Sequence, residues 1–364
     1  MIKLLKQLVE TESPSHDKSA VDRVGAIIAD ECRKLGAQVE LHPQTETGDH
    51  IVARFPGAVT ERGILILCHM DTVFPPGTLK KMPFYEKDGK IFGPAVLDMK
   101  GGIVIALRAI SSILSSGRPA TLPVTALFTS DEEIGSHTSR ALIESLAREA
   151  SVVFVAESGL VNGALKTWRK GVGGFDINVK GRAAHAGGDH EKGRNAIEEM
   201  AHQIIAIQKL TDYSRQTTLN VGVINGGTVS NVVPEDAFAE VDVRVMQPGE
   251  WERIEAEMRN LKPVLQDTTI KVTGVLNRPP MPYSEANKSA FEKAYQIAKD
   301  KLGMELIAGG SGGGSDGNFV APLGIPVLDG MGACGEGLHS EREYIFAESL
   351  EARAKLLAAL IQNW

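Results

Sequence analysis

Histidine and carboxylate side chains in this sequence recur directly after short apolar segments. His69 follows the segment 64–68 (ILILC), and Glu157 follows 152–156 (VVFVA). The set also includes a carboxylate two residues after His69, an acidic run after 123–129 and two residues in glycine-containing loops: Asp71, Asp131, Glu132, Glu133, Asp98 and His339. Taken singly, each has an ordinary explanation, such as a structural histidine, a solvated acidic run, a helix cap or a surface ion pair. Their recurrence after successive predicted strands favours one shared site.

The chemistry that these side chains suit is metal-assisted hydrolysis. Two histidines and three carboxylates without a thiolate form a ligand set that suits zinc. The same ligand set also accepts cobalt or manganese. That number of ligands fits two ions sharing a bridging carboxylate, and two ions about 3.5–4 Å apart can hold a hydroxide and polarise a scissile carbonyl. The reaction needs one further base, and the run 131–133 (DEE) offers a spare carboxylate beside a ligand.

The segments around these residues predict an α/β domain. Amphipathic patterns predict helices, and apolar runs predict strands; the helices are expected at about 16–35, 101–116 and 138–149, and the strands at 51–55, 64–68, 123–129 and 152–156. Continuous apolar strands separated by helices are typical of a mostly parallel sheet covered on both faces. Polar residues that follow such strands meet at the carboxyl edge of the sheet, where open α/β sheets bind ligands.

From about residue 171 the pattern changes to strict polar–apolar alternation, which is typical of an antiparallel sheet with one open face. Strands are predicted at 175–181, 219–224, 239–245 and 269–275, with helices at about 194–210 and 250–265. This β-α-β-β-α-β order is ferredoxin-like. After Pro279-Pro280 the first style resumes, with segments at 286–301, 305–308, 326–328 and 346–361. We therefore expect a domain of residues 1–170 and 282–364, interrupted by an inserted domain at 171–281.

Composition excludes several classes of protein. The chain has 364 residues, 43% hydrophobic and 23% charged, which argues against a disulfide-stapled mini-protein, a fibre or a disordered chain. The formal net charge is −7 with acids and bases interspersed, so neither a nucleic-acid nor a membrane partner is expected. The N-terminal segment lacks signal-peptide features, and three cysteines without CxxC spacing fit reduced thiols. These features predict a cytoplasmic protein.

The glycine-rich tract 309–317 (GGSGGGSDG) allows three interpretations. It resembles a flexible linker, but its position inside a compact domain favours a loop that holds backbone close to a ligand. The tract also contains G-x-S-x-G around Ser315, the nucleophile elbow of serine hydrolases, with Asp329 and His339 downstream. A remote alternative is therefore a serine hydrolase. A second alternative is a non-catalytic binding module that keeps the fold.

Eight motifs in order give the sequence a family resemblance. They are HMDTV (69–73), GPAVLDMKGG (93–102), TSDEEIGS (129–136), ESG (157–159), KGRAAHAG (180–187), GGTVSNVVP (226–234), GGGSDG (312–317) and GLHS (337–340). Together they resemble the co-catalytic zinc aminoacylase and carboxypeptidase family, from about residue 60 to 345. That family includes glutamate carboxypeptidases of the carboxypeptidase G type, acetylornithine deacetylase and succinyl-diaminopimelate desuccinylase, and the sequence is most similar to the first branch.

The resemblance implies a zinc-exopeptidase-like catalytic domain with two Zn²⁺ per subunit, and Co²⁺ or Mn²⁺ as substitutes. His69, Asp98 and Glu157 would hold one ion, and Asp98, Glu133 and His339 would hold the other, with Asp98 bridging. A glutamate at position 157 is the pattern of the deacylases and glutamate carboxypeptidases, whereas di- and tripeptidases of the family tend to have aspartate. The inserted ferredoxin-like domain would form a homodimer.

The remaining family positions imply the reaction. Glu132 would be the general base, Asp71 would orient His69, and His185 would reach across the dimer to the developing oxyanion. The implied substrate-binding positions are Arg278, which pairs with an α-carboxylate, Asn231, Gly313 and Gly314. The expected substrate is a small N-acyl or peptidyl amino acid with a free α-carboxylate. Glutamate carboxypeptidase-like cleavage is the first expectation, and deacylation of the acetylornithine deacetylase type is the alternative.

Overall fold

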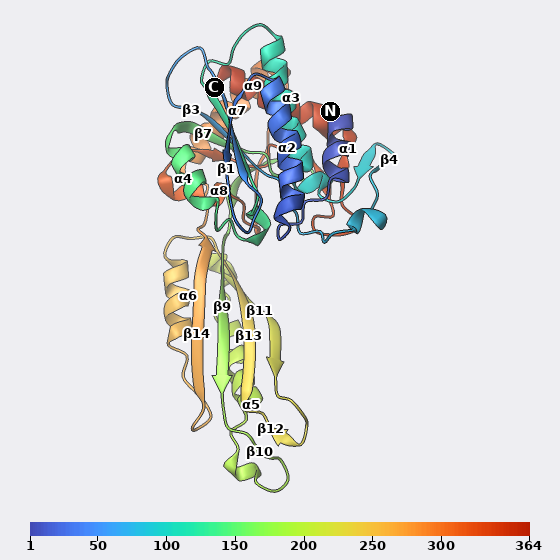
Figure 1. Cartoon of the computed structure of the whole chain (residues 1–364). Coiled ribbons are helices and arrows are strands. Elements are labelled where there is room, and N and C mark those ends of the chain that lie inside the picture. Colours follow the sequence, from blue (N-terminus) through green and yellow to red (C-terminus); the bar gives the residue numbers. More distant parts are fainter. The chain divides into compact units, whose positions relative to one another are not determined.

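The computed structural model describes all 364 residues, which form two compact units (Figure 1). The first unit comprises Met1–Trp168, Tyr283–Ser311 and Ser315–Trp364, and the second comprises Arg169–Pro282 and Gly312–Gly314. The expected fold class, a mixed α/β protein with a mostly parallel central sheet, is confirmed. No helix combines the length and apolar character needed to cross a membrane.

The first unit is built on a six-stranded sheet. Its strands, in spatial order, are β1 (Gln38–His42), β2 (His50–Phe55), β6 (Val124–Thr129), β3 (Gly63–His69), β7 (Ala150–Val155) and β16 (Val327–Leu328). The neighbours from β6 to β16 pair in parallel, whereas β1–β2 and β2–β6 pair antiparallel. The carboxyl ends of β6, β3, β7 and β16 therefore lie along one edge of the sheet.

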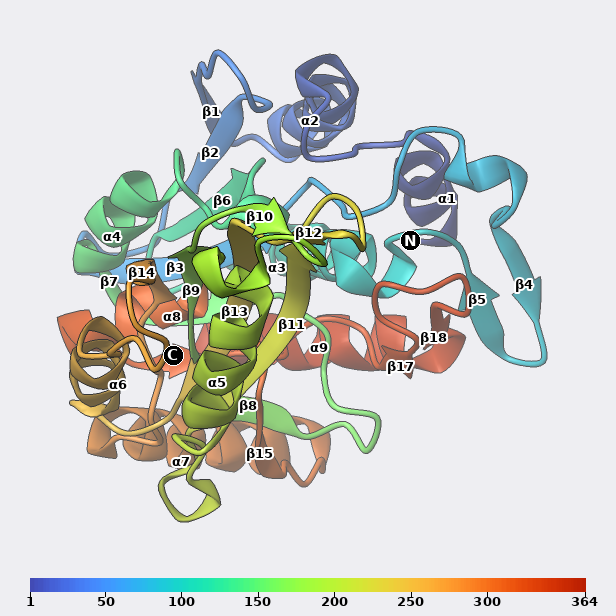
Figure 2. The same ribbon diagram turned by 90° about the horizontal axis from the view of Figure 1, so that it is seen from below.

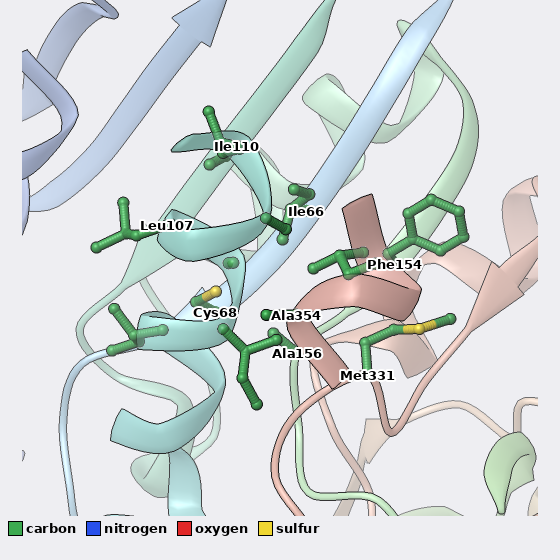
Figure 3. Close-up of a cluster of buried hydrophobic side chains, with 14 of the residues drawn as sticks. Ile66, Cys68, Leu107, Ile110, Phe154, Ala156, Met331 and Ala354 are labelled. Carbon is green, nitrogen blue, oxygen red and sulfur yellow. The ribbon is translucent and has the colours of Figure 1, made fainter. Parts of the chain in front are cut away.

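Seven α-helices belong to this unit: α1 (Ile2–Glu10), α2 (Lys18–Lys34), α3 (Gly101–Ser115), α4 (Arg140–Arg148), α7 (Glu285–Leu302), α8 (Gly317–Val320) and α9 (Ala347–Asn363). Figure 3 shows side chains of β3, β7, α3 and α9 in one buried apolar cluster, in which Ile66 lies between Ile110 of α3 and Phe154 of β7. Helix α2 begins where the Asp17 carboxylate accepts a hydrogen bond from the amide of Ala20, an N-cap that satisfies a free donor.

Gly102 lets the start of α3 pack directly on the end of β7. A Cβ at this position would lie 1.8 Å from the carbonyl oxygen of Ala156, a backbone atom that cannot yield as a flexible side chain can. Ala156 immediately precedes Glu157, and Gly102 lies four residues after Asp98. The close approach of the two backbones therefore brings together two segments that carry candidate ligands.

Small sheets extend the first unit around its loops. Figure 2 shows a four-stranded sheet with the order β17 (Gly335–Glu336), β18 (Tyr344–Phe346), β5 (Lys90–Phe92) and β4 (Tyr85–Lys87). Strand β8 (Leu165–Arg169) pairs with β15 (Ala308–Ser311), so the glycine tract begins as ordered strand and the linker interpretation is wrong. The next residues, 312–314, group with the second unit, because the guanidinium of Arg169 donates to the carbonyls of Gly313 and Gly314.

The second unit has the ferredoxin-like order expected from the sequence. Its elements are β9 (Gly171–Lys180), β10 (Ala184–His185), α5 (Ala196–Gln208), β11 (Thr218–Gly226), β12 (Val232–Val233), β13 (Asp236–Val245), α6 (Glu250–Arg259) and β14 (Thr269–Arg278). The main sheet is antiparallel with the order β11-β13-β9-β14. Apolar residues of both helices pack with one face of this sheet, where the ring of Trp251 stacks on Phe175. On β9, alternate side chains of the other face are exposed.

Some element boundaries differ from the sequence expectation. The strand expected at 305–308 lies at Ala308–Ser311, because its pairing with β8 places the glycines there. The helix expected to reach residue 265 ends at Arg259. The segment after this helix is bound instead by the carboxylate of Glu199, which accepts hydrogen bonds from the amides of Val264 and Leu265.

Candidate metal centre

His69 is the last residue of β3, and the end of the strand directs its imidazole at two carboxylates. The side chain is buried, and its Nε2 lies 3.1 Å from Oδ1 of Asp98 and 3.3 Å from Oε1 of Glu157. The other ring nitrogen, Nδ1, lies 3.0 Å from the backbone carbonyl oxygen of Asp71. A carbonyl accepts only, so Nδ1 carries a proton and Nε2 faces the site.

The Asp71 carboxylate lies between His69 and the acidic loop. It lies 3.5 Å from Nδ1 of His69, farther than the backbone carbonyl of the same residue. The two carboxylate oxygens also accept hydrogen bonds from the backbone amides of Glu132, at 3.2 Å, and Glu133, at 3.1 Å. The hydroxyl of Ser15 donates to the same carboxylate at 2.7 Å. Asp71 therefore joins the end of β3 to the acidic loop after β6.

The acidic run divides into one structural and two site residues. The carboxylate of Asp131 accepts hydrogen bonds from the Thr138 amide and hydroxyl and from the Ser139 amide, so it closes its own loop. Glu132 and Glu133 begin a short 3₁₀ turn, Glu132–Ile134. Oε2 of Glu133 lies 3.4 Å from Nε2 of His339. Burial raises the pKa of Glu133, and the nearby charge of Asp98 acts in the same direction.

Asp98 lies between two imidazoles. It belongs to an irregular helical turn, Val96–Lys100, that leads into α3. Its Oδ1 faces His69, and its Oδ2 lies 3.0 Å from Nε2 of His339. Burial by itself would raise the pKa of this carboxyl, but the histidines on either side hold the pKa far below its usual range.

His339 reaches the site from the loop between β17 and β18. Its backbone has a φ of +58°, a left-handed conformation that is uncommon for a residue other than glycine and clusters at functional sites. Hydrogen bonds from Nε2 toward Asp98 and Glu133 raise the pKa of His339 to about 10. The pKa of His69 is also raised well above its ordinary value; burial opposes this, and the surrounding carboxylates outweigh the burial.

The geometry of these five side chains fits a pair of divalent ions. A tetrahedral ion bound about 2.0–2.1 Å from each ligand atom separates neighbouring ligand atoms by roughly 3.4 Å. The four distances from an imidazole Nε2 to a carboxylate oxygen of Asp98, Glu133 or Glu157 are all between 3.0 and 3.4 Å. Candidate ligand atoms of His69, Asp98 and Glu133 lie within 4.8 Å of one another. Asp98 offers one oxygen to each histidine, which is the arrangement a bridging carboxylate requires.

The remaining predicted residues belong to the second unit. The pairing of β10 with β12 brings His185 next to the segment that contains Asn231. The amide of Ala186 also donates a hydrogen bond to the carbonyl of Asn231. Nδ1 of His185 accepts hydrogen bonds from the amides of Gly187 and Gly188. The proton of the neutral ring is therefore on Nε2, which can donate to a ligand. Arg278 ends β14 as a buried side chain against Gly314, where a Cβ would meet its Cδ at 2.6 Å.

The geometry contradicts the serine hydrolase alternative. Ser315 is fully buried, and its hydroxyl donates to the carboxylate of Asp329 at 2.6 Å. His339, which would have to be its base, is engaged with Asp98 and Glu133. The apparent nucleophile elbow is therefore a coincidence of the glycine-rich composition.

Sequence reasoning missed two residues that support the centre. Ser15 contacts Asp71 from the loop before α2, and Glu343 contacts the backbone of the Asp98 turn. Neither lies beside a predicted strand end, and both act from segments remote in sequence. The only available signal was the position of Glu343 four residues after His339.

Comparison with known proteins gives consistent matches. The model of a family described as peptidase family M20/M25/M40 matches residues 65–363. Carboxypeptidase G2 of Pseudomonas sp. (strain RS-16) is 30% identical, over all of this chain and 89% of its own length. Acetylornithine deacetylase of Proteus mirabilis is 28% identical, over all of this chain and 96% of its own length. The crystal structure of aminopeptidase PepT from Bacillus cereus superposes with a TM-score of 0.82 at 23% identity, covering all of this chain and 97% of that one.

The raised pKa values of the two histidines predict that metal ions and protons compete for this site. His339 is protonated at pH 7 because its pKa is raised to about 10, and the pKa of His69 is raised as well. Binding of Zn²⁺ must therefore displace protons, at least one of them from His339, and the affinity must weaken as the pH falls. Calorimetric titration with Zn²⁺ in buffers of different ionisation enthalpy measures the number of protons released.

The His339→Ala variant should release about one proton fewer. The matched control is His202→Ala, which removes an exposed histidine on α5 of the second unit. This control should release as many protons as the unaltered chain. Equal proton release by the His339→Ala variant and the unaltered chain would show that the pKa of His339 is not raised.

Proposed function

The chain belongs to the peptidase family M20/M25/M40, and from that premise we propose that it cleaves the amide bond of small N-acyl or peptidyl amino acids with a free α-carboxylate. Members of this family are hydrolases of the metallopeptidase or amidohydrolase type. They typically depend on a dinuclear metal centre. The observation that carries the proposal is Asp98 between His69 and His339, with one oxygen toward each. Zn²⁺ is the proposed metal, with Co²⁺ or Mn²⁺ as substitutes.

Each site residue has a part in the proposed reaction. Two divalent ions held by His69, Glu157, Asp98, Glu133 and His339 would supply Lewis acidity, which polarises the amide carbonyl and acidifies water. Glu132 takes a proton from the attacking water and delivers it to the leaving nitrogen. Its position is supported by Asp71, which holds the backbone amide of Glu132. His185 donates a hydrogen bond from Nε2 to the oxygen that becomes negative, and Asn231 assists in binding the substrate.

A glutamate carboxypeptidase-like specificity is our first proposal. It is supported by the 30% identity to carboxypeptidase G2 over the whole of this chain. It is also supported by the residue type at position 157, whose carboxylate faces His69: a glutamate is the pattern of the glutamate carboxypeptidases and deacylases. N-acyl amino acid deacylation is the second candidate, favoured by the similar full-length match to acetylornithine deacetylase. A screen of N-acyl amino acids with Glu, Asp, Orn, Ala or Leu at the carboxylate end distinguishes the two. Preference for Orn would overturn the first proposal.

A homodimer formed by the second unit is part of the proposal. Strand β11 is one of the two edge strands of the main sheet, and Ile224 on it is 53% exposed. On the neighbouring helix α5, Ile205 is 57% exposed. An exposed apolar edge strand is a surface on which another strand pairs, and two copies of one edge can do so about a two-fold axis.

Replacement of the proposed base should abolish turnover without loss of metal. Glu132→Gln removes the group that accepts the proton, so kcat should fall about 10²- to 10⁴-fold. The neighbouring variant Glu133→Gln, at a proposed ligand, should instead lower the metal content. Steady-state kinetics and elemental analysis of both proteins give the two measurements. Full turnover in the Glu132→Gln variant would favour a different base.

Removal of the Arg278 guanidinium should weaken binding of substrates that carry an α-carboxylate. Arg278→Ala should raise KM on the order of a hundredfold or more, because a bidentate charged pair is lost. Arg278→Lys should recover only part of this loss, since lysine lacks the planar fork. Arg259→Ala, on an exposed arginine of α6 that pairs with Glu255, is the matched control. A KM for the Arg278→Ala variant equal to that of the unaltered chain would refute the assignment.

Disruption of the β11 edge should produce monomers. Ile224→Lys places a charge on the exposed edge, so light scattering after size exclusion should report half the mass of the unaltered chain. Val275→Lys, on the opposite edge strand β14 and 65% exposed in the unaltered chain, should leave the dimer intact. A monomeric unaltered chain, or a dimeric Ile224→Lys variant, would contradict this interface.

A further inference from the structure

Glu343 is a buried carboxylate beside the metal centre, and the mechanism proposed above does not use it. It precedes β18 and lies four residues after His339 in sequence. Its side chain is completely excluded from solvent. A buried carboxylate has a high cost of desolvation, so its surroundings must compensate for that cost.

The compensating groups are three backbone amides of the Asp98 turn. Oε1 of Glu343 accepts hydrogen bonds from the amides of Leu97, at 2.7 Å, and Asp98, at 3.0 Å. Oε2 accepts one from the amide of Ala95 at 3.1 Å. The acceptor and donors are about 245 residues apart in sequence. One side chain therefore binds the backbone that leads up to the proposed bridging ligand and the amide of the ligand residue itself.

The Asp98 turn requires such a partner because it is not a regular helix. Ala95 has a φ of +59°, and Asp98 and Met99 have non-helical dihedral angles. The amides of residues 95, 97 and 98 lie before or within the first turn of this segment, where a helix supplies no acceptor, and a buried amide without an acceptor is costly. The two oxygens of Glu343 satisfy these amides and fix their direction.

Glu343 also belongs to the segment that carries His339. The loop from Gly337 to Glu343 is closed by the pairing of β17 with β18, and the Glu343 amide donates to the carbonyl of Ser340. A shift of this side chain would move the Asp98 turn relative to the His339 loop. The distance between Oδ2 of Asp98 and Nε2 of His339, 3.0 Å, therefore depends on Glu343.

We propose that Glu343 is a positioning residue that sets the spacing between Asp98 and His339 and so determines the affinity of the dinuclear centre. The inference rests on the proposed metal centre. Glu343 does not touch the substrate or the reacting atoms. Groups that orient metal ligands typically change metal affinity 10- to 100-fold when they are mutated, so about that loss is expected here.

Glu343→Gln is the test variant, because its single acceptor oxygen cannot serve all three amides. Its matched control is Glu199→Gln, which alters another buried carboxylate that accepts backbone amides, those of Val264 and Leu265, in the second unit. Zn²⁺ affinity is measured by competition with a chromogenic chelator, and Co²⁺-loaded protein reports the ligand geometry in its visible spectrum. Thermal unfolding of each protein measures the structural cost.

The expected result is a 10- to 100-fold weaker affinity for at least one Zn²⁺ and a shifted Co²⁺ spectrum in Glu343→Gln. Glu199→Gln should lower the unfolding temperature and leave both metal measurements unchanged. If both variants bind Zn²⁺ as the unaltered chain does, the role of Glu343 is overturned while the proposed function stands. If the unaltered chain binds no Zn²⁺, both are overturned. Should Glu343→Gln fail to fold, Glu343→Asp decides: unaltered Zn²⁺ affinity and Co²⁺ spectrum overturn the role, and changes in both support it.

Discussion

The position of one carboxylate, that of Asp98, constrains the rest of the catalytic unit. Its two oxygens face two imidazoles at 3.1 and 3.0 Å, and those imidazoles come from segments that are 270 residues apart in sequence. Such a spacing tolerates displacements of only about half an ångström. The parallel sheet places His69 and Glu157 at the ends of two neighbouring strands. The packing of Gly102 on Ala156 fixes the distance between these strand ends and the Asp98 turn.

The centre is also an electrostatic compromise. Buried carboxylates repel one another, and burial raises the pKa of Glu133. The histidines between them take up protons in response, as their raised pKa values show. The cluster of carboxylate acceptors that raises the pKa of both histidines also favours divalent cations. The Asp71 carboxylate takes part in this compromise, because it lies 3.5 Å from Nδ1 of His69 and helps to raise the pKa of that imidazole. It also accepts hydrogen bonds from the amides of Glu132 and Glu133 and from Ser15.

The two units divide the proposed tasks. The first unit contains all five candidate ligands and Glu132, and each lies at or near a strand end or in a loop closed by hydrogen bonds. The second contains His185, Asn231 and Arg278, the residues proposed to contact substrate. Its sheet has one face packed against two helices and an apolar edge at β11, which suits a unit that also pairs with a second copy.

The sequence alone determined the fold class, the ferredoxin-like order of the second unit and the identity of the candidate ligands, because apolar periodicity and local motifs are read over a few neighbouring residues. It did not reveal that Asp71 holds the base loop, that Ser315 is bound to Asp329, or that Glu343 supports the Asp98 turn. Those contacts join segments tens to hundreds of residues apart. Only the tertiary structure decides them, because hydrogen-bond partners are chosen by distance in space, and local patterns of residues carry no record of that distance.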